Sequence, residues 1–283
     1  MGLALDKDDV CLQLLPERGG GIGRFTWRGH DIFRPADNGS DPLKLSNFPL
    51  IPYCNRIAHG RFTANGQDVT LPMTHEAADG EHSLHGLGWI TPWHISASDE
   101  TSAALMQSHD GSIWPWAYDA EQHFELTDNG YIHRIAITNR AQSKMPYGLG
   151  LHPYFPRGGA HLSMPVAGRW NNGADRLPDG YESYDAQPDW FDGSFIDHCY
   201  ARSGGGDIVI TAPAWRLTMK TDGLNQFAHV YLPQGEDYFC VEPVSHIPDA
   251  VNSDLPEENS GQCWLMPGER AERQVEFIVQ EPE

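Results

Sequence analysis

Apolar residues recur at every second position along most of this chain, and this alternation constrains the fold more than any other feature. The pattern is clear in segments 10–14, 131–137 and 275–279. Successive side chains of a strand point to opposite faces, so such a segment buries one face. No segment keeps the i, i+3, i+4 apolar spacing of a helix for more than a turn or two. The pattern therefore predicts many strands and almost no helix.

Turn signals separate these strands. Asn65-Gly66 and Asp128-Asn129-Gly130 each stand between two apolar runs, and Asn and Gly tolerate the positive φ that tight hairpins need. We predict an all-β chain, a large antiparallel β-sandwich, in which residues 1–283 form a single domain. Segments 36–48, 73–82, 171–194 and 252–262 are polar and read as long loops, which is where sites commonly lie.

Charge and cysteine content exclude several classes of function. The formal net charge of −20 repels nucleic-acid backbones and anionic membrane surfaces. The five cysteines are scattered and odd in number, which argues against a disulfide framework or a zinc ribbon. The N-terminal residues lack the basic and apolar regions of a signal peptide, and no apolar run approaches the length of a membrane span. We expect a cytoplasmic protein.

Two segments invite a ligand-binding interpretation that their spacing does not support. The glycine-rich segment 18–24 has neither the spacing nor the Lys-Ser/Thr of a phosphate-binding loop, so we interpret it as a turn. His82 and His85 lie three residues apart, and a metal site there needs a third ligand from elsewhere. Hydrogen bonding to a hydroxyl-rich ligand is the better use of these imidazoles.

Three ionisable residues are embedded in apolar sequence. Arg56 follows a Pro- and Ile-rich run, so it must meet a carboxylate, carbonyl groups or a ligand. His152 stands between Leu151 and Pro153, where a core histidine is the simpler alternative to a catalytic one. Glu242 ends an apolar strand, where partial desolvation makes it a better base unless it pairs with Arg56.

Five short motifs occur in one order along the chain: NRI-x-x-GRF from Asn55, LHG from Leu84, HPYF from His152, DHCY from Asp197, and EP-x-x-x-x-PDA-x-N from Glu242. In this order they resemble the aldose 1-epimerase (galactose mutarotase) family, from about residue 20 to the C-terminus. The resemblance implies a β-sandwich of the galactose-mutarotase type, with its site in a cleft on the sandwich.

The resemblance also implies roles for the motif residues. His152 corresponds to the general acid and Glu242 to the general base, whereas Arg56, His85 and Asp197 correspond to residues that hold sugar hydroxyls. It implies no metal and no organic cofactor, and a small sugar as the substrate, with no nucleic-acid or membrane partner. Mutarotation then opens the ring by moving one proton from the anomeric hydroxyl to Glu242 and another from His152 to the ring oxygen. A nearby carboxylate, for which Asp197 is a candidate, would keep His152 protonated.

Three alternatives remain open at this stage. A non-catalytic carbohydrate-binding protein needs the same recognition residues but neither His152 nor Glu242. An enzyme for an anionic sugar, such as a sulfosugar, needs a cation near the substrate. The candidates for that cation are Arg24, Arg157, Arg169 and Arg202. A metal-dependent enzyme would use His82, His85 and one further ligand.

Overall fold

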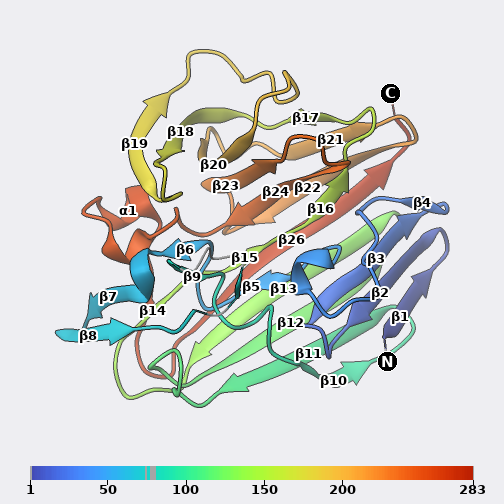
Figure 1. The fold of residues 1–283 in the computed structure, drawn as a ribbon. Helices are drawn as coiled ribbons and strands as arrows, with labels where there is room; N and C mark the ends of the chain where they lie inside the picture. Colours follow the sequence, from blue (N-terminus) through green and yellow to red (C-terminus); the bar gives the residue numbers. More distant parts are fainter. Residues whose placement is uncertain (1, 74, 77–80, 283) are drawn as a thin grey trace.

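Two eight-stranded antiparallel sheets dominate the structure, a computed structural model that describes residues 2–73, 75–76 and 81–282 (Figure 1). We call them the long sheet and the site sheet. In spatial order, the long sheet consists of β10 (His94–Ser98), β11 (Ser102–His109), β12 (Tyr118–Thr127), β13 (Gly130–Asn139), β26 (Arg270–Gln280), β22 (Trp215–Asp222), β21 (Ile208–Ala212) and β17 (His161–Ser163).

The site sheet has most of its strands in the second half of the chain. In spatial order, it consists of β19 (Pro178–Ser183), β18 (Val166–Asn172), β20 (Ile196–Arg202), β23 (Phe227–Leu232), β24 (Tyr238–Val244), β15 (Gly150–Leu151) and β5 (Pro49–Leu50), with β16 (Tyr154–Pro156) also paired to β24.

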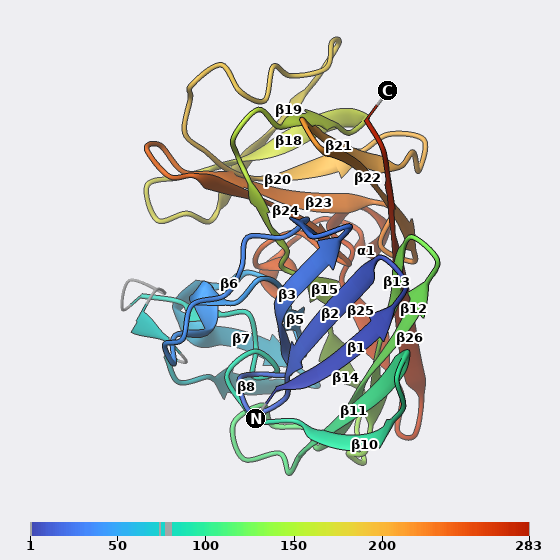
Figure 2. The same ribbon diagram turned by 90° about the vertical axis from the view of Figure 1, so that its right-hand side faces the viewer.

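Smaller elements complete the fold, and Figure 2 shows the N-terminal strands beside the two large sheets. A four-stranded sheet contains β1 (Leu3–Lys7), β2 (Val10–Leu15), β3 (Gly21–Trp27) and β4 (His30–Asp31). Two-stranded pairs join β6 (Arg56–Ile57) to β9 (Ser83–Leu84), β7 (Arg61–Ala64) to β8 (Gln67–Thr70), and β14 (Met145–Tyr147) to β25 (Cys263–Leu265). The helical segments are single turns: α1 (Glu257–Ser260), η1 (Pro42–Lys44), η2 (Ala58–Gly60) and η4 (Ala250–Asn252).

The predicted all-β antiparallel class is confirmed. The hairpin predicted at Asn65-Gly66 joins β7 to β8, and both residues have positive φ, 53° and 73°. The prediction of a loop over 171–194 is wrong in part, because β18 continues to Asn172 and β19 forms an edge strand inside the segment. Nearly every side chain of β19 is exposed, so its sequence carries no alternation to recognise.

The other predicted loops differ in outcome. Segment 36–48 contains only the single turn η1 as a helix, and segment 252–262 contains α1 and the end of η4. Segment 73–82 lies partly outside the described residues, which exclude 74 and 77–80. The single-domain organisation stays a prediction.

Alternation along the strands separates the protein core from the site. In β24, Phe239 and Val241 are fully buried in the main apolar cluster, which the long sheet also joins. Cys240 and Val244 belong to a second, smaller cluster on the opposite face. The site sheet is therefore covered on both faces, and polar side chains on its second face are desolvated.

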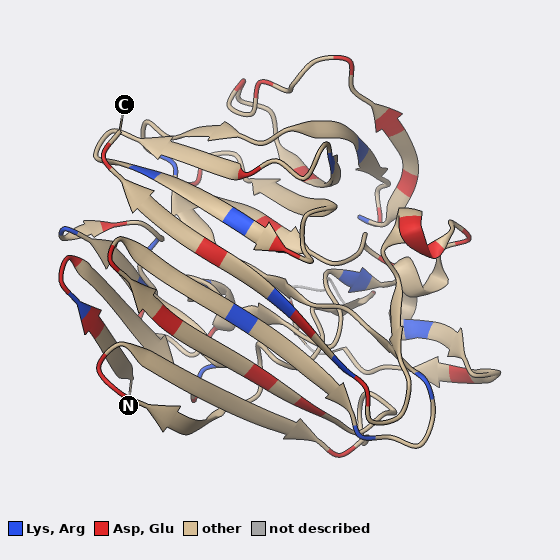
Figure 3. Ribbon diagram, turned by 180° about the vertical axis from the view of Figure 1, so that it is seen from behind, with Lys and Arg blue, Asp and Glu red and all other residues tan. Residues whose placement is uncertain are grey.

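The outer face of the long sheet is charged. Figure 3 shows acidic and basic residues distributed over the strands seen from behind. Arg270 lies 3.1 Å from Glu121, and Arg134 lies 3.3 Å from Glu125. These exposed pairs contribute little to stability but keep this face of the sheet soluble.

His133 illustrates the structural alternative for a histidine on an apolar face. It lies in β13, is 1% exposed, stacks on Phe124 with a ring-centroid distance of 4.2 Å, and its Nε2 is 3.0 Å from Gln122 Oε1. Burial disfavours the charged imidazolium and lowers the pKa of His133 to about 3. In the described structure this histidine belongs to the core.

Acidification should therefore destabilise the fold through His133. Above pH 6.5 the imidazole is neutral in both states. Below that value only the unfolded chain takes up a proton, so stability falls as the pH approaches the folded pKa. Urea unfolding at pH 7.5 and pH 5 should show His133→Gln losing about 2 kcal/mol less than the parent on acidification. Equal losses in both proteins would contradict this assignment.

Candidate active site

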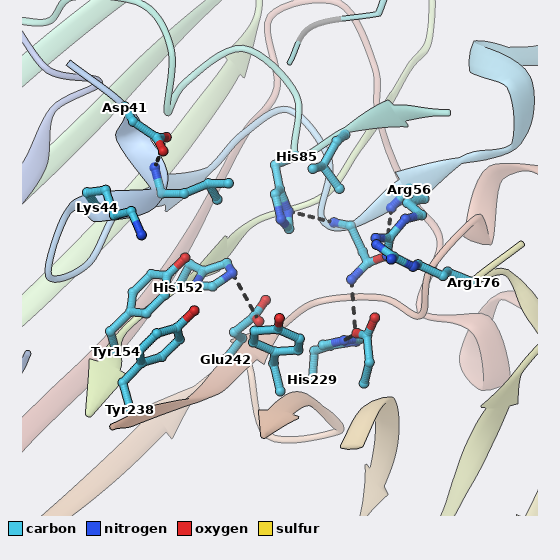
Figure 4. Close-up of a pocket in the computed structure, with 15 residues that line it drawn as sticks. Asp41, Lys44, Arg56, His85, His152, Tyr154, Arg176, His229, Tyr238 and Glu242 are labelled. Carbon is cyan, nitrogen blue, oxygen red and sulfur yellow. Dashed lines mark hydrogen bonds and ion pairs between the residues drawn. The ribbon is translucent and has the colours of Figure 1, made fainter. Parts of the chain in front are cut away.

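A pocket on the second face of the site sheet gathers all five residues that the sequence analysis selected (Figure 4). They are Arg56, His85, His152, Asp197 and Glu242. The cavity has a volume of about 220 Å³, which suits a small molecule. The remaining lining residues are Asp41, Leu43, Lys44, Asn55, Leu84, Tyr154, Arg176, His229, Tyr231 and Tyr238.

Side chains alternate between the two faces along three neighbouring strands, and this explains how residues distant in sequence meet in the pocket. Asp197 in β20, His229 in β23 and Glu242 in β24 each alternate with residues of the main core. His229 and Glu242 are direct partners in the antiparallel ladder. Directly opposed side chains lie on the same face and within contact distance, so the sheet itself places the three groups together.

His152 reaches the pocket from the short connection between β15 and β16. Leu151 and Phe155 are fully buried in the main core, which leaves His152 and Tyr154 on the site face. The imidazole stacks between Phe48 and Tyr154, with ring-centroid distances of 4.5 and 4.8 Å. Its backbone N–H donates to the carbonyl of Phe48. These contacts leave the ring little freedom to rotate.

His152 and Glu242 form a close pair at the centre of the pocket. His152 Nε2 lies 3.2 Å from Glu242 Oε1, and the two side chains are 8% and 2% exposed. Glu242 Oε2 is buried and has no hydrogen-bond partner among the described residues. An unsatisfied buried carboxyl oxygen is costly, and such atoms in native proteins call for an explanation.

Burial shifts both members of the pair toward their uncharged forms. Desolvation raises the pKa of Glu242 well above its ordinary value, and the nearby Asp197 charge raises it further, whereas Arg56 lowers it. Desolvation is also the main reason that the pKa of His152 is lowered to about 3. Both directions have the same cause, and they favour one shared proton located on Glu242 when no sugar is bound.

Asp197 has a different partner from the one expected. The sequence analysis offered it as the carboxylate that keeps His152 protonated, but Asp197 Oδ1 lies 2.7 Å from His229 Nε2. Burial alone would raise the pKa of Asp197, but the hydrogen bond from His229 and the nearby charges of Arg56 and Arg176 lower it below its ordinary value. Asp197 is therefore an ionised carboxylate in the pocket wall. Its effect on the pKa of His152 is smaller than that of burial.

Asn55 and His85 hold each other in an unusual backbone conformation. Both are left-handed, with φ of 56°, and each backbone N–H finds a partner in the other residue: Asn55 N–H donates to His85 Nδ1, and His85 N–H donates to the Asn55 carbonyl. Positive φ costs free energy in residues other than glycine and is concentrated at functional sites. The β6–β9 pairing presents Arg56 beside them.

Several lining residues were missed by the sequence analysis. His229, Tyr231 and Tyr238 lie on site-facing positions of β23 and β24, which the alternation of their neighbours would have indicated. Lys44 and Arg176 come from irregular or weakly patterned segments that give no such signal.

The four arginines proposed for an anionic substituent have other environments, and none of them lines the described pocket. Arg24 pairs with Asp31, and Arg169 pairs with Glu182. Arg157 donates to the carbonyl of Pro233. Arg202 donates to Thr221 and to two carbonyl groups. The cations that do line the pocket are Lys44, Arg56 and Arg176.

His82 does not line the pocket, and both of its ring nitrogens contact backbone groups instead. Its Nδ1 accepts from the backbone N–H of His59, and its Nε2 lies 3.0 Å from the carbonyl of Asp175. Within residues 2–73, 75–76 and 81–282, no three His, Cys, Asp or Glu side chains are grouped to hold a metal ion. The proposed pairing of His82 with His85 as ligands therefore has no geometric support among these residues.

The sequence matches the family model of aldose 1-epimerase over residues 3–277. The chain belongs to the aldose 1-epimerase family. The protein YphB of Escherichia coli (strain K12) is 25% identical to this chain. The alignment covers 92% of this chain and 93% of YphB.

Solved structures of this fold are also similar. One from Escherichia coli K12 superimposes with a TM-score of 0.89 over 99% of both chains at 24% identity. The galactose 1-epimerase of Lactobacillus acidophilus NCFM superimposes with a TM-score of 0.80 over 100% of this chain and 95% of its own at 16% identity. At these identities the likeness shows a shared fold.

The sequence analysis also expected no membrane-spanning segment. Among the described residues, none of the helices has both the length and the apolar character that crossing a membrane requires.

Proposed function

We propose that this aldose 1-epimerase family member is a mutarotase, which interconverts the α and β anomers of a hexose or related aldose by opening and reclosing the ring. The observation that carries the proposal is the 3.2 Å separation of His152 Nε2 and Glu242 Oε1 inside a desolvated pocket. Ring opening needs a proton acceptor and a proton donor at two oxygens bonded to the same carbon. A touching acid and base match that requirement.

The reaction balances with the one proton that the pair shares. The anomeric hydroxyl gives its proton to the Glu242 carboxylate, the bond between the anomeric carbon and the ring oxygen breaks, and His152 Nε2–H protonates the ring oxygen. The aldehyde then rotates, and closure reverses both transfers. This route needs the proton on His152 when the sugar is bound, so substrate binding shifts it from Glu242. Hydrogen bonds that sugar hydroxyl groups donate to the Glu242 carboxylate replace the water that burial removed, and they favour this shift of the proton to His152.

The other predicted residues hold the sugar. Arg56 and the His85 imidazole offer donors to hydroxyl oxygens, and the ionised Asp197 accepts from a hydroxyl. We propose that the enzyme acts on a free sugar in the cytoplasm, with no metal or organic cofactor and no nucleic-acid or membrane partner.

Charges of both signs line the pocket, so its charge does not single out an anionic sugar. Three cations line the cavity, Lys44, Arg56 and Arg176, and three carboxyl groups face the same space. Asp197 is ionised among them. A bound anion would be attracted by the cations and repelled by Asp197, whereas the hydroxyl groups of a neutral sugar can hydrogen-bond to groups of both kinds.

Anomer exchange measured by NMR tests the proposal and separates it from the alternatives. With pure α anomers of neutral hexoses, hexuronates and sulfonated sugars, the protein should speed exchange for at least one neutral aldose. Acceleration only with acidic sugars would favour the anionic-substrate alternative. Binding of these sugars without any acceleration would establish a carbohydrate-binding protein and overturn the proposal.

The pH dependence follows from the shifted pKa values of the pair. A second proton on the pair removes the base, and this happens only near the lowered pKa of His152, about 3. Loss of the shared proton removes the acid, and this happens near the raised pKa of Glu242. The enzyme-catalysed kcat/KM should therefore not fall as the pH is lowered from 7.5 to 5. A loss of activity centred near pH 6.5, the ordinary value for histidine, would contradict this.

A further inference from the structure

A chain of hydrogen bonds runs along the pocket wall beside Glu242. Arg56 NH1 lies 3.3 Å from Asn55 Oδ1, Asn55 Nδ2 lies 3.4 Å from His229 Nδ1, and His229 Nε2 lies 2.7 Å from Asp197 Oδ1. Figure 4 shows Arg56 and His229 on the side of the pocket opposite Tyr154 and Tyr238. The four groups come from three separate parts of the chain.

The direction of this hydrogen-bond chain is determined at its Arg56 end. Asn55 Oδ1 accepts from both the backbone N–H and the guanidinium of Arg56, groups that can only donate. The Asn55 amide nitrogen therefore faces His229, so His229 Nδ1 must accept. The proton of a neutral His229 then lies on Nε2, where it donates to the Asp197 carboxylate.

We propose that His229 is a positioning residue in its neutral Nε2–H form, which holds Asp197 so that its second carboxylate oxygen receives one particular hydroxyl group of the sugar. His229 is 3% exposed and lies directly opposite Glu242 in the strand ladder, so it is held by the same sheet as the catalytic carboxyl. Asp197 lines the pocket and has one oxygen bound to His229. The other carboxylate oxygen is the one that we assign to the substrate.

This arrangement selects the chemical class of the group that binds there. An ionised carboxylate accepts hydrogen bonds and donates none, so its substrate partner must be a neutral hydroxyl group. A deoxy sugar leaves the carboxylate unpaired, and an anionic substituent is repelled. The inference rests on the proposed mutarotase function, because it concerns the same bound sugar.

The tautomer can be measured without any assay of activity. In ¹⁵N-histidine-labelled full-length protein at pH 7.5, the His229 resonances, assigned by loss in His229→Gln, should show a protonated Nε2 and an unprotonated Nδ1. A protonated Nδ1, in either the other tautomer or the imidazolium, would overturn the proposed direction. This result stands whether or not the protein proves to be a mutarotase.

Kinetics of monodeoxy sugars test the positioning role. His229→Leu should lower kcat/KM for the best aldose by about 10- to 100-fold, chiefly through KM, because Asp197 loses a charged hydrogen bond. His229→Gln, whose amide can still donate, should recover part of this loss. One monodeoxy aldose, which lacks the hydroxyl group that Asp197 binds, should react poorly with the unmutated enzyme. For this sugar, His229→Leu should lower kcat/KM much less than it does for the complete sugar.

A matched control separates positioning from general damage. His133→Leu removes the hydrogen bond of another buried histidine, one that does not line the pocket, and should leave kcat and KM unchanged. If His229→Leu reduces activity on every deoxy sugar by the same factor as on the parent sugar, the positioning role is wrong. Absence of exchange activity in the unmutated protein would instead refute the proposed function.

Discussion

Replacement of Glu242 by Gln is expected to slow enzyme-catalysed anomer exchange by ~10²–10⁴-fold, because the amide cannot accept the proton of the anomeric hydroxyl. Glutamine has the same shape as the uncharged glutamic acid that burial favours. The free energy of unfolding at pH 7 should therefore change by less than about 1 kcal/mol. Exchange spectroscopy on a pure anomer and urea unfolding measure the two effects.

Glu236→Gln is the matched control for charge. Glu236 is an exposed carboxylate just before β24, so its replacement removes one negative charge near the pocket without touching the pair. Its exchange rate should equal that of the parent. A folded Glu242→Gln protein with the parental rate would exclude Glu242 as the base.

Replacement of His152 by Gln is expected to produce a loss of similar size, ~10²–10⁴-fold, since the ring oxygen then has no proton donor of suitable pKa. The double variant His152→Gln/Glu242→Gln should be no slower than the slower single variant, because the two groups act as one unit on a shared proton. Rates for the parent, both single variants and the double variant form a complete cycle.

The cycle has a clear opposing outcome. If the losses multiply, each group contributes independently, and the shared-proton mechanism is wrong. Binding of the sugar, measured by titration, should persist in both single variants because Arg56, His85 and Asp197 remain in the pocket. Loss of binding as well would mean that the substitutions damage the pocket rather than the chemistry.

Local sequence patterns were sufficient for the fold class and for the strongest hairpins. Period-two alternation predicted the antiparallel strands, and Asn65-Gly66 predicted a turn because both residues adopt positive φ. The exposed strand β19 was missed, since a strand with almost no buried face shows no alternation. Backbone pairing at a sheet edge depends on the neighbouring strand, which the local sequence does not contain.

The candidate site divides in a similar way. The motifs indicated Arg56, His85, His152, Asp197 and Glu242, and the tertiary structure places all five around one cavity. The motifs did not indicate that Asp197 pairs with His229. That partner lies 32 residues away in another strand, and its position on the site face depends on how β20 and β23 are aligned.

Alone, the amino-acid sequence determined which side chains are apolar, where the chain turns, and which ionisable groups are embedded in apolar segments. These are local properties, because they depend on residue type and spacing. Only the tertiary structure decided that His152 and Glu242 lie 3.2 Å apart and that burial shifts their pKa values in opposite directions. Desolvation and distance depend on every element packed around a group, so they arise only when the sheets assemble.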